Sequence, residues 1–332
     1  MSGSMLALVA GNGPRWELRE VAVPSPGPGQ VLVRVRAAGV NRADLGMLAG
    51  SYNPAGMARG GEFTAGLELA GEVEGVGIGV DGVEAGDRVM AAALGSFAAF
   101  APVDHRHLMP VPSSLAWTDA AALPVGLSTE HDALLQAGFL AGDRVLVVGA
   151  TSGVGMLGVQ LAKALGAALV IATTTSPAKV GALRDVGADL VVDTTAGSVT
   201  DAVLSATGGA GADVVLDHVG GPGFGDLLPA TRVRGTIVNI GRLGGPRATV
   251  DLDQLAFRRL RVQGTTFSIR SAEERADVYA AVTRDALPTV ADGRVRPVVD
   301  TVVPFVEAQQ AADRMRSNEA VGKIVLEMPT AT

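Results

Sequence analysis

The sequence predicts an α/β protein with a doubly wound parallel sheet of six strands and a separate β-rich part. Two observations predict this architecture. From about residue 120, short apolar runs alternate with helical patterns of about 10 to 15 residues, which is typical of parallel strands with helices on both faces of the sheet. Before that point, short apolar runs are separated by Gly and Pro, which indicates strands joined by tight turns.

The composition fits this architecture and excludes several classes of protein. The chain has 332 residues, of which 48% are hydrophobic, and this length is typical of two domains. Its net charge of -7 argues against a nucleic-acid-binding face, and the absence of Cys excludes disulfides and thiolate metal sites. No N-terminal segment has a basic start followed by a long apolar core, and no apolar run reaches about 18 to 20 residues, so we expect no secretory signal and a cytoplasmic protein that does not bind membranes.

The β-rich part covers roughly the first 110 residues. The segment VLVRVR from Val31 alternates apolar and polar residues, as a strand with one solvent-exposed face does. Similar short runs follow in GLELAGEVEGVGIGV from Gly66 and GDRVMAAAL from Gly86. Many short strands of this kind predict a small barrel or sandwich.

The alternating part supplies the elements of the parallel sheet. The predicted strands lie at 145–148, 169–172, 190–192, 214–216, 236–240 and 261–264. The predicted helices lie at 154–165, 178–186, 199–206, 223–231 and 252–259. In the tail, helices are expected at 272–287 and 306–317 and a strand at 322–327, and we expect these elements to return to the β-rich domain.

A glycine cluster follows the first strand of the predicted sheet. Gly153, Gly155 and Gly158 form G-x-G-x-x-G between an apolar strand and a helix. In this context the pattern predicts a dinucleotide site, because free amide groups at the helix N-terminus bind a pyrophosphate. The predicted contacts are Ser152, Gly153, Val154 and Gly155, and the alternative is a tight turn that holds no ligand.

The end of the second strand indicates which dinucleotide is bound. Enzymes that prefer NAD usually place Asp or Glu there, whereas this chain has Thr174 within VIATTTSPAKV. A carboxylate about 4 Å from a 2′-phosphate is unfavourable by roughly 1 to 4 kcal/mol, so its absence permits NADP. Thr174 and Ser176 offer hydrogen-bond donors and Lys179 offers a positive charge. The alternative is an ordinary helix start with a surface lysine.

An ordered series of segments extends over nearly the whole chain and carries a family resemblance. The segments are AAGVNRADL (37–45), GLELAGEVEGVGIGV (66–80), GDRV (86–89), AALPVGLS (121–128), GDRVLVVGATSGVGMLGVQLAKALGA (142–167), GADVVLDHVGG (211–221), GTIVNIGRLGG (235–245), GTTFSIRS (264–271) and VGKIVLE (321–327). In these segments the chain resembles the zinc-independent quinone oxidoreductase branch of the medium-chain dehydrogenase/reductase superfamily.

The resemblance implies a domain arrangement, a cofactor and an oligomeric state. We expect a GroES-like catalytic domain at 1–122, completed by 268–332, and a Rossmann domain at 123–267 that binds NADPH. A homodimer is expected through edge-to-edge pairing of Rossmann sheets, with RLRVQGTTF from Arg259 as the edge strand. Further cofactor contacts implied by the resemblance are Val219, Gly220, Ile240, Arg242, Phe267 and Ser268.

The resemblance also implies that the catalytic zinc of related dehydrogenases is missing. The positions that match its three ligands are Asn41, Leu67 and Pro124. A catalytic zinc needs about three protein ligands, and none of these side chains replaces a thiolate or an imidazole. We therefore expect no metal. Without a metal to polarise a simple ketone, quinones and α,β-unsaturated carbonyls are the expected small-molecule substrates.

Three residues are candidates for catalysis. Tyr52 is similar in its spacing from Asp44 to a catalytic tyrosine of enoyl-thioester reductases, and it either donates a proton or lines the pocket. Asn41 is expected to hydrogen-bond the cofactor or a substrate carbonyl. Ser128 takes the place of a family threonine near the nicotinamide, or else it caps a helix. Glu130 departs from the family pattern and either makes the pocket more polar or lies in solvent at a helix start.

Two further functions stay open alongside quinone or enone reduction. The chain also fits an enoyl-thioester reductase that acts on acyl-carrier-protein or coenzyme A substrates. A protein of a different class, which binds NADPH without catalysis, is the other open hypothesis.

Overall fold

A computed structural model describes residues 3–11, 13–52 and 61–329, and the chain divides into two compact units. Unit 1 consists of Met1–Val125, Phe267–Ala291 and Pro297–Thr332. Unit 2 consists of Gly126–Thr266 and Asp292–Arg296. Unit 2 is thus almost continuous in sequence, whereas unit 1 combines the beginning and the end of the chain.

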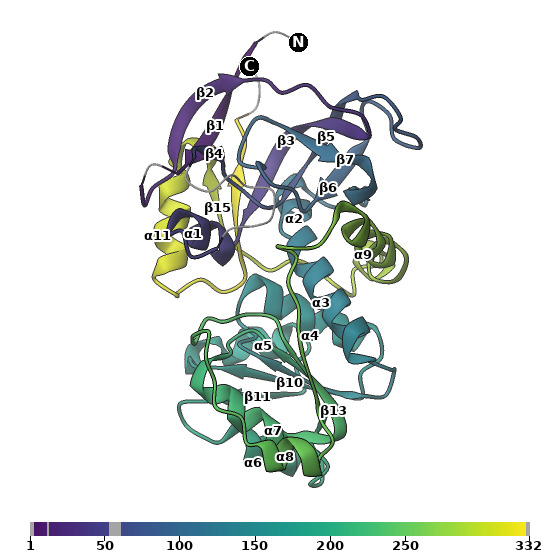
Figure 1. The fold of residues 1–332 in the computed structure, drawn as a ribbon, viewed down its shortest axis with the longest axis vertical. Helices are drawn as coiled ribbons and strands as arrows, with labels where there is room; N and C mark the ends of the chain where they lie inside the picture. Colours follow the sequence, from purple (N-terminus) through teal and green to yellow (C-terminus); the bar gives the residue numbers. More distant parts are fainter. Residues whose placement is uncertain (1–2, 12, 53–60, 330–332) are drawn as a thin grey trace. The chain divides into compact units, whose positions relative to one another are not determined.

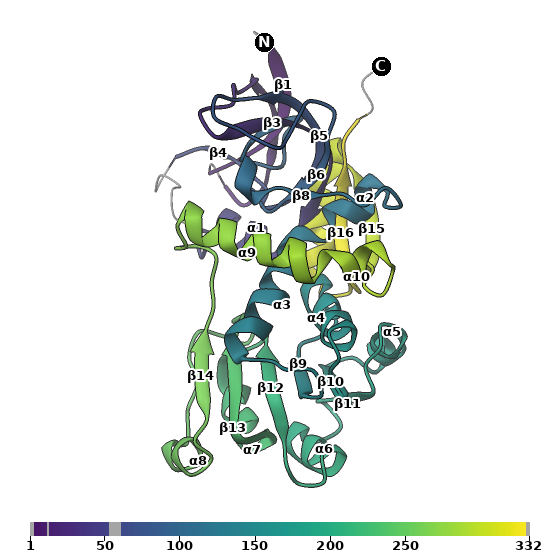
Figure 2. The ribbon, with the colours of Figure 1, turned by 90° about the vertical axis from the view of Figure 1, so that its right-hand side faces the viewer.

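Unit 2 contains a parallel sheet whose described strands lie in the order β11-β10-β9-β12-β13-β14 (Figure 2). The order reverses between β9 and β12, so the carboxyl ends of these two strands form the switch point at which doubly wound sheets bind ligands. The strands are β9 (Arg144–Val148), β10 (Leu169–Thr174), β11 (Leu190–Asp193), β12 (Ala212–Asp217), β13 (Thr231–Asn239) and β14 (Arg261–Gly264).

Helices cover both faces of this sheet, with α4 and α5 on one face and α6, α7 and α8 on the other (Figure 1). Helix α3 (Pro124–Ala137) also lies in unit 2 except for its first two residues. The remaining elements are α4 (Gly153–Ala164), η2 (Pro177–Lys179), α5 (Val180–Asp185), α6 (Val199–Ala206), η3 (Gly221–Asp226), α7 (Leu227–Ala230) and α8 (Leu252–Phe257).

The core of unit 2 follows from the pattern of the strands. One face of the sheet carries Leu146, Ile171 and Ile237, which pack with Val203 of α6 and Leu228 of α7 in one buried cluster. Residues next to these in sequence point to the opposite face and are buried as well. Strands that are apolar on both faces fit only between two layers of helices, which explains their continuous apolar runs.

Unit 1 consists mainly of antiparallel strands. Strand β3 runs through its larger sheet, where the path is β15-β16-β3-β5-β6-β8 and β7 also pairs with β3. A smaller sheet has the order β2-β1-β4. The strands are β1 (Ser4–Ala10), β2 (Glu17–Ala22), β3 (Gln30–Val40), β4 (Phe63–Thr64), β5 (Leu69–Val76), β6 (Arg88–Ala91), β7 (Phe100–Asp104), β8 (Met109–Pro110), β15 (Val299–Pro304) and β16 (Lys323–Glu327).

Short helices surround these sheets, and the last strand of the chain enters the sheet beside β3. Val325 of β16 pairs with Gly39 of β3, so the tail completes the fold of the N-terminal part. Trp16 and Phe97 meet edge to face in its core, with ring centroids 5.2 Å apart. The helices are α1 (Arg42–Leu48), η1 (His105–His107), α2 (Trp117–Ala121), α9 (Ala272–Asp285), α10 (Leu287–Ala291), η4 (Phe305–Glu307) and α11 (Ala308–Arg316).

The predicted α/β fold is confirmed, and the six strands of the parallel sheet lie where the sequence placed them. One predicted helix, at 223–231, is wrong in detail. Residues Gly221–Asp226 form a 3-10 helix, and only Leu227–Ala230 are α-helical. The physical reason is the composition of GPGFGD, because Pro and three Gly disfavour a continuous α-helix.

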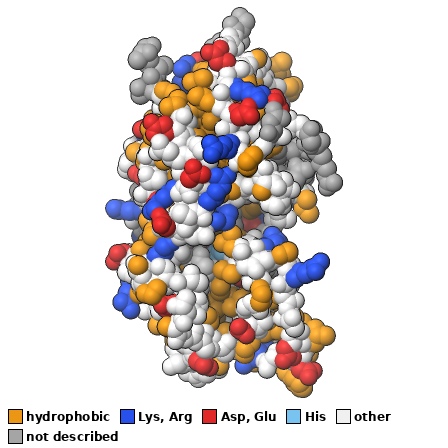
Figure 3. Space-filling model, turned by 90° about the vertical axis from the view of Figure 1, so that its left-hand side faces the viewer, with side chains coloured by type: hydrophobic (Ala, Val, Ile, Leu, Met, Phe, Trp, Pro, Cys, Tyr) orange, Lys and Arg blue, Asp and Glu red, His pale blue; other side chains and the backbone are white. Residues whose placement is uncertain are grey.

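The surface gives no sign of a membrane span. Within residues 3–11, 13–52 and 61–329, no helix is both long enough and apolar enough to cross a bilayer. On the face shown in Figure 3, basic and acidic side chains are interspersed, and hydrophobic atoms lie among them in patches.

The buried cluster of unit 2 predicts where truncation destabilises the protein. Leu146 is fully buried in β9, so Leu146→Ala should leave a cavity and lower the free energy of unfolding by about 2 to 5 kcal/mol. Leu252→Ala is the matched control, because Leu252 is 70% exposed and its truncation should change stability by less than about 0.5 kcal/mol. Urea denaturation measures both values, and equal losses would contradict the assignment of the core.

Candidate functional site

A buried polar cluster lies in unit 1 where β3, β5 and β16 meet. It consists of Asn41, Asp44, Glu68 and Lys323, which we call the Lys323 cluster. The Lys323 ammonium forms an ion pair with Glu68, and its Nζ donates to Asn41 Oδ1 at 2.6 Å. Asn41 Nδ2 donates to Glu68 Oε1 at 2.8 Å. All four side chains are less than 9% exposed, so each charge depends on its protein partners.

The local fold makes room for this cluster at Gly39. A Cβ atom at position 39 would lie 2.5 Å from both Glu68 Oε1 and the Ala121 carbonyl oxygen. Only glycine therefore lets the Glu68 carboxylate lie against β3. The other carboxylate oxygen of Glu68 accepts a hydrogen bond from the Val125 amide at 2.8 Å. Val125 is the second residue of α3, so Glu68 also stabilises the positive end of that helix.

Asp44 lies beside the ion pair as a buried acid. Its Oδ2 accepts a hydrogen bond from the Asn41 amide at 2.7 Å, and its Oδ1 has no hydrogen-bond partner among the described residues. Burial raises the pKa of Asp44 to about 8, and the charge of Glu68 adds to that effect against the opposing hydrogen bonds and Lys323. Asp44 therefore carries a proton at neutral pH, and the Lys323 cluster is close to electrically neutral.

The donor set at this place does not fit a metal ion. Asn41 already binds Glu68 and Lys323 through its amide, and Lys323 brings a positive charge to the position. Among the described residues, no three His, Asp or Glu side chains come together as a ligand set. The Asn41 amide contacts are internal to the cluster, so the role of Asn41 toward a cofactor or substrate stays a prediction.

Tyr52 lies just after α1 at the border of the described residues. It is half-buried, and its amide donates to the Gly46 carbonyl oxygen at 3.1 Å. A Cβ atom at Gly46 would be 3.0 Å from Tyr52 Cβ, so glycine at this position lets the tyrosine pack against α1. Tyr52 is thereby held in the same unit as the Lys323 cluster, and its role as a proton donor stays a prediction.

The glycine cluster in unit 2 forms the expected strand-turn-helix. Ser152 caps α4, and its Oγ accepts a hydrogen bond from the Gly155 amide at 3.0 Å. Helix geometry leaves the amides of Gly153 and Val154 without acceptors inside the helix. A Cβ atom at Gly155 would lie 2.8 Å from the Cα atom of Ala150, so this glycine permits close packing. These features fit a pyrophosphate bound at the start of α4.

The end of β10 offers hydroxyl groups and a lysine but no acidic side chain. The Thr174 hydroxyl accepts a hydrogen bond from the Ser176 amide at 3.1 Å and shapes a tight turn. Ser176 then leads into η2, whose last residue is Lys179. Thr175, which lies between Thr174 and Ser176, is exposed. The turn thus brings hydroxyl and ammonium groups to the carboxyl edge of the sheet, where a 2′-phosphate would need donors.

A second loop at this edge follows β12 and is held by Asp217. The Asp217 carboxylate accepts hydrogen bonds from the amides of Val219 and Gly220, both at about 3 Å, and from Asn239 Nδ2 at 2.9 Å. Gly220 has a positive φ of 59°, which favours glycine. Asp217 therefore holds the backbone of the predicted contact residues Val219 and Gly220 in place through these hydrogen bonds.

The remaining predicted cofactor residues lie in different surroundings. The Ile240 amide donates to the Asp217 carbonyl oxygen at 2.7 Å, and Arg242 is exposed beyond it. Phe267 and Ser268 belong to unit 1, where the Arg270 guanidinium lies 4.6 Å from the centre of the Phe267 ring.

Ser128 and Glu130 lie inside α3, so two of the alternatives from the sequence are wrong. The helix begins at Pro124, which leaves Ser128 in its interior and excludes a role as N-cap. Glu130 is fully buried, which contradicts a place in solvent. Glu130 Oε1 lies 2.6 Å from Nε2 of His218, which follows β12. The helix starts early because the Glu68 carboxylate and the proline both favour a helix start at this point.

Sequence reasoning missed the roles of Asp217 and His218 and the buried partners of Lys323. The signal for Asp217 was present, since an acidic residue at the end of a buried strand, three positions before Gly220 and Gly221, is suited to hold a loop. Lys323 and Asn41 lie 282 residues apart, and His218 and Glu130 lie 88 residues apart. No local pattern marks such pairs.

Known families match both units. The sequence model of the Alcohol dehydrogenase GroES-like domain family matches residues 27–113, and that of the family described as Zinc-binding dehydrogenase matches residues 153–283. The first match covers most strands of unit 1, and the second includes the glycine cluster and the strands β10 to β14.

Individual relatives extend over the full chain. The chain is 35% identical over 321 residues to the spectinabilin polyketide synthase system protein NorB of Streptomyces orinoci, a match that covers 94% of this chain and 14% of NorB. It is 30% identical to quinone oxidoreductase-like protein 2 of Bos taurus, covering 93% and 88% of the two chains. A mycobacterial protein solved in complex with NADPH has a TM-score of 0.85 at 28% identity, covering 97% of this chain and 100% of that one.

The raised pKa of Asp44 predicts how stability depends on pH. The pKa is about 4 in the unfolded chain and about 8 in the folded one, so stability is highest below the unfolded value and is lost as the pH rises through 8. Asp44→Asn removes the titrating group and keeps the acceptor for the Asn41 amide. The unfolding free energy of this variant relative to wild type should therefore increase by about 2 to 5 kcal/mol between pH 5 and pH 9.

Urea denaturation at pH 5, 7 and 9 measures this difference. Asp185→Asn is the control, because the exposed Asp185 ends α5 in unit 2 and the same substitution there leaves the Lys323 cluster intact. A constant offset for Asp44→Asn would show that Asp44 is ionised in the folded protein.

Proposed function

Because the chain belongs to the quinone oxidoreductase-like proteins of the medium-chain dehydrogenase/reductase superfamily, we propose that it is an NADPH-dependent, zinc-free oxidoreductase. Its proposed substrate is a quinone or an activated α,β-unsaturated carbonyl compound, which it reduces by hydride transfer. The observation that carries this proposal is that the chain contains both features. Unit 2 has a strand-turn-helix of the dinucleotide-binding type, and unit 1 has a polar cluster whose donor set does not suit zinc.

The start of α4 supports binding of a nicotinamide dinucleotide. The unpaired amides of Gly153 and Val154 and the positive end of the helix dipole suit the pyrophosphate. The loop held by Asp217 lies at the same carboxyl edge, next to the switch point between β9 and β12. When bound, the reduced nicotinamide supplies the hydride, and the protein supplies binding, orientation and exclusion of water.

The end of β10 supports a preference for the phosphorylated cofactor. No acidic side chain lies between Ala172 and Val180, whereas Ser176 brings a hydroxyl group and Lys179 an ammonium group, and the buried Thr174 hydroxyl shapes their turn through hydrogen bonds to the Ser176 backbone. These groups suit a 2′-phosphate better than the ribose hydroxyls that an acid would accept. The mycobacterial relative that was solved with NADPH agrees with this preference.

The chemistry proposed for unit 1 needs no metal. Hydride addition to a quinone or an enone places negative charge on an oxygen that is conjugated with the acceptor carbon, so the charge is already delocalised. A quinone that has accepted the hydride then takes one proton from water to become the hydroquinone. An enone needs a proton at carbon, and Tyr52 is the proposed donor, held beside α1 by the contact with Gly46. Asn41 and Ser128 are proposed to orient the substrate and the nicotinamide.

A second candidate function is reduction of an enoyl thioester. The match to the polyketide synthase protein NorB over 94% of this chain favours it, although the chain spans only 14% of that protein. The same proton donor would serve both reactions.

A homodimer formed at β14 and a cytoplasmic location stay part of the proposal, and the exposed edge of β14 is available for pairing.

Cofactor preference tests the proposal directly. Lys179→Ala should raise the Kd for NADPH about tenfold and change the Kd for NADH less than twofold, because only NADPH carries the 2′-phosphate. Lys163→Ala is the control, since Lys163 pairs with Asp189 at 2.9 Å near the far end of α4 and should affect neither Kd. Fluorescence titration measures both values. Equal effects on the two cofactors would contradict a 2′-phosphate site at Lys179.

Turnover with a panel of quinones, enones and enoyl thioesters tests the reaction. Tyr52→Phe should lower kcat for enones and enoyl thioesters by about 10²- to 10⁴-fold and change kcat for quinones less than about threefold. The absorbance of NADPH follows each reaction. Unchanged enone turnover in the variant would remove Tyr52 as the donor. Tight NADPH binding without turnover on any acceptor would indicate a binding protein instead of an enzyme.

A further inference from the structure

A buried acid and a buried histidine meet beside the two loops of unit 2 that are proposed to bind the cofactor, which are the glycine-rich turn after β9 and the loop after β12. We call Glu130 and His218 the Glu130–His218 pair. Glu130 is fully buried and His218 is 5% exposed. Glu130 Oε1 lies 2.6 Å from His218 Nε2, and His218 Nδ1 lies 2.9 Å from the carbonyl oxygen of Val148. The proposed function gives this pair no role.

The contacts of His218 fix the number of protons in the pair. A carbonyl oxygen only accepts, so His218 Nδ1 must carry a hydrogen and donate it to Val148. The contact between Nε2 and Glu130 Oε1 then holds one further proton, which belongs formally to one of the two groups. In either case the pair has no net charge. Removal of that proton leaves one negative charge in a place without water.

The position of the pair connects it to both loops that are proposed to bind the dinucleotide. A Cβ atom at Gly158 would lie 2.4 Å from Glu130 Oε2, so the carboxylate rests against the second turn of α4. Val148, which accepts from His218, is the last residue before the glycine-rich turn, and Val219 and Gly220 follow His218 directly. The pair thus joins α3, the end of β9, α4 and the end of β12 within one unit.

We propose that Glu130 and His218 are positioning residues for the dinucleotide, and that their shared proton keeps the base of the glycine-rich turn neutral so that the pyrophosphate binds. This inference rests on the proposed cofactor site. It adds a pair of residues that do not touch the dinucleotide and that make its affinity depend on pH.

The surrounding charges determine the direction of this dependence. Burial by itself lowers the pKa of His218, but the attraction of Glu130, its hydrogen bond and that of Val148, and the charge of Asp217 together raise the pKa above the usual value of 6.5. Asp217 lies at the end of β12, and His131 adjoins Glu130 on α3. The facing turn of α4 and the end of β9 carry no titratable side chain. These charges therefore favour the protonated form of His218, and its proton is lost as the pH rises.

Simple electrostatics gives the size of the effect. Gly158 lies five residues along α4 from Gly153, about 7 Å at 1.5 Å per residue, which places the carboxylate about 10 Å from a pyrophosphate at the helix start. One unit charge at that distance weakens binding of a diphosphate by roughly one to two orders of magnitude at an effective dielectric constant of about 20. Screening by salt reduces this, so we expect about a tenfold change.

The experiment is a fluorescence titration of NADPH between pH 7.5 and pH 10 with wild type and Glu130→Gln. The 2′-phosphate of NADPH has a pKa near 6 and is fully ionised throughout this range. In wild type the Kd should rise about tenfold with pH. Glu130→Gln keeps the shape and a hydrogen bond to His218 but holds no proton that is lost in this range, so its Kd should stay within about threefold of one value.

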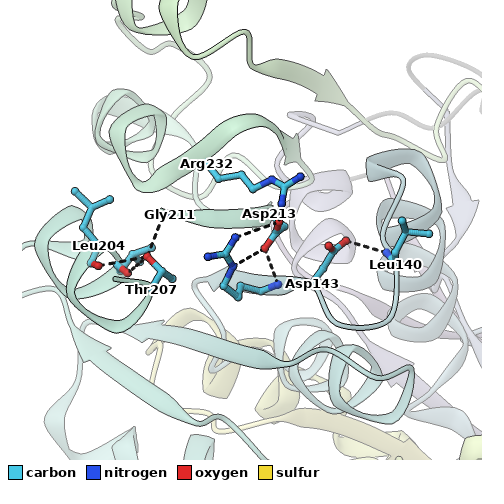
Figure 4. A network of polar contacts seen from close by, with 9 residues as sticks. Leu140, Asp143, Leu204, Thr207, Gly211, Asp213 and Arg232 are labelled. Atoms are coloured by element: carbon cyan, nitrogen blue, oxygen red, sulfur yellow. Dashed lines mark hydrogen bonds and ion pairs between the residues drawn. The ribbon is translucent and has the colours of Figure 1, made fainter. Parts of the chain in front are cut away.

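Two controls separate this effect from general destabilisation. Asp213→Asn removes a buried carboxylate at the opposite end of β12, where Asp213 binds Arg144 Nε at 2.7 Å and Arg232 Nη1 at 2.5 Å, and it should keep the wild-type rise (Figure 4). Both titrations are repeated in an Asp44→Asn background, because the pKa of Asp44 also lies near 8. Circular dichroism at each pH shows that the variants stay folded.

Each possible result of the titrations either supports or overturns the positioning role of the Glu130–His218 pair. A rise in wild type that Glu130→Gln abolishes and Asp213→Asn retains supports the positioning role. A flat wild-type profile, or a rise that Glu130→Gln retains, would overturn it while the cofactor site remains. If wild type does not bind NADPH or NADH at any pH, the proposed function itself fails.

Discussion

A charge buried away from water requires a partner inside the protein, and a polar cluster in each unit is organised around this constraint. In unit 1 the Glu68 carboxylate is neutralised by Lys323. In unit 2 the Glu130 carboxyl group lies 2.6 Å from Nε2 of the buried His218. Removing one member of such a pair destabilises a protein by about 3 to 5 kcal/mol, whereas replacing both by apolar residues is often tolerated. The pairs therefore restrict which single substitutions each unit accepts.

Glycines make both arrangements sterically feasible. Gly39 lets Glu68 lie against β3, and Gly158 lets Glu130 lie against α4. The third glycine of the G-x-G-x-x-G pattern thus has a specific partner in this protein, since a carboxylate fills the space beside it. The glycine pattern that indicates phosphate binding in the sequence is therefore also needed for the close approach of helix α3 to helix α4.

The sequence predicted the fold well because the signals for it are local. Each strand of the parallel sheet is an apolar run followed by a helical pattern, and these periodicities depend only on neighbouring residues. The glycine cluster and the absence of an acid near Thr174 are local in the same way. The Lys323 cluster and the Glu130–His218 pair were not predictable, because their members come from strands and helices far apart in the chain. The interior position of Ser128 and the burial of Glu130 were not predictable for the same reason, since a distant carboxylate helps to set the start of α3.

The entry of β16 into the sheet beside β3 has a consequence for biosynthesis. Lys323 leaves the ribosome 282 residues after Asn41, so the Glu68 carboxylate lacks its counterion until residue 323 has been synthesised. Unit 2 lies almost entirely between these two segments, and its sheet is complete at residue 264. Domains usually fold in the order of their synthesis, beginning at the N-terminus. Here the inserted domain is ready first, and the nascent N-terminal strands depend on protection from aggregation until the tail arrives.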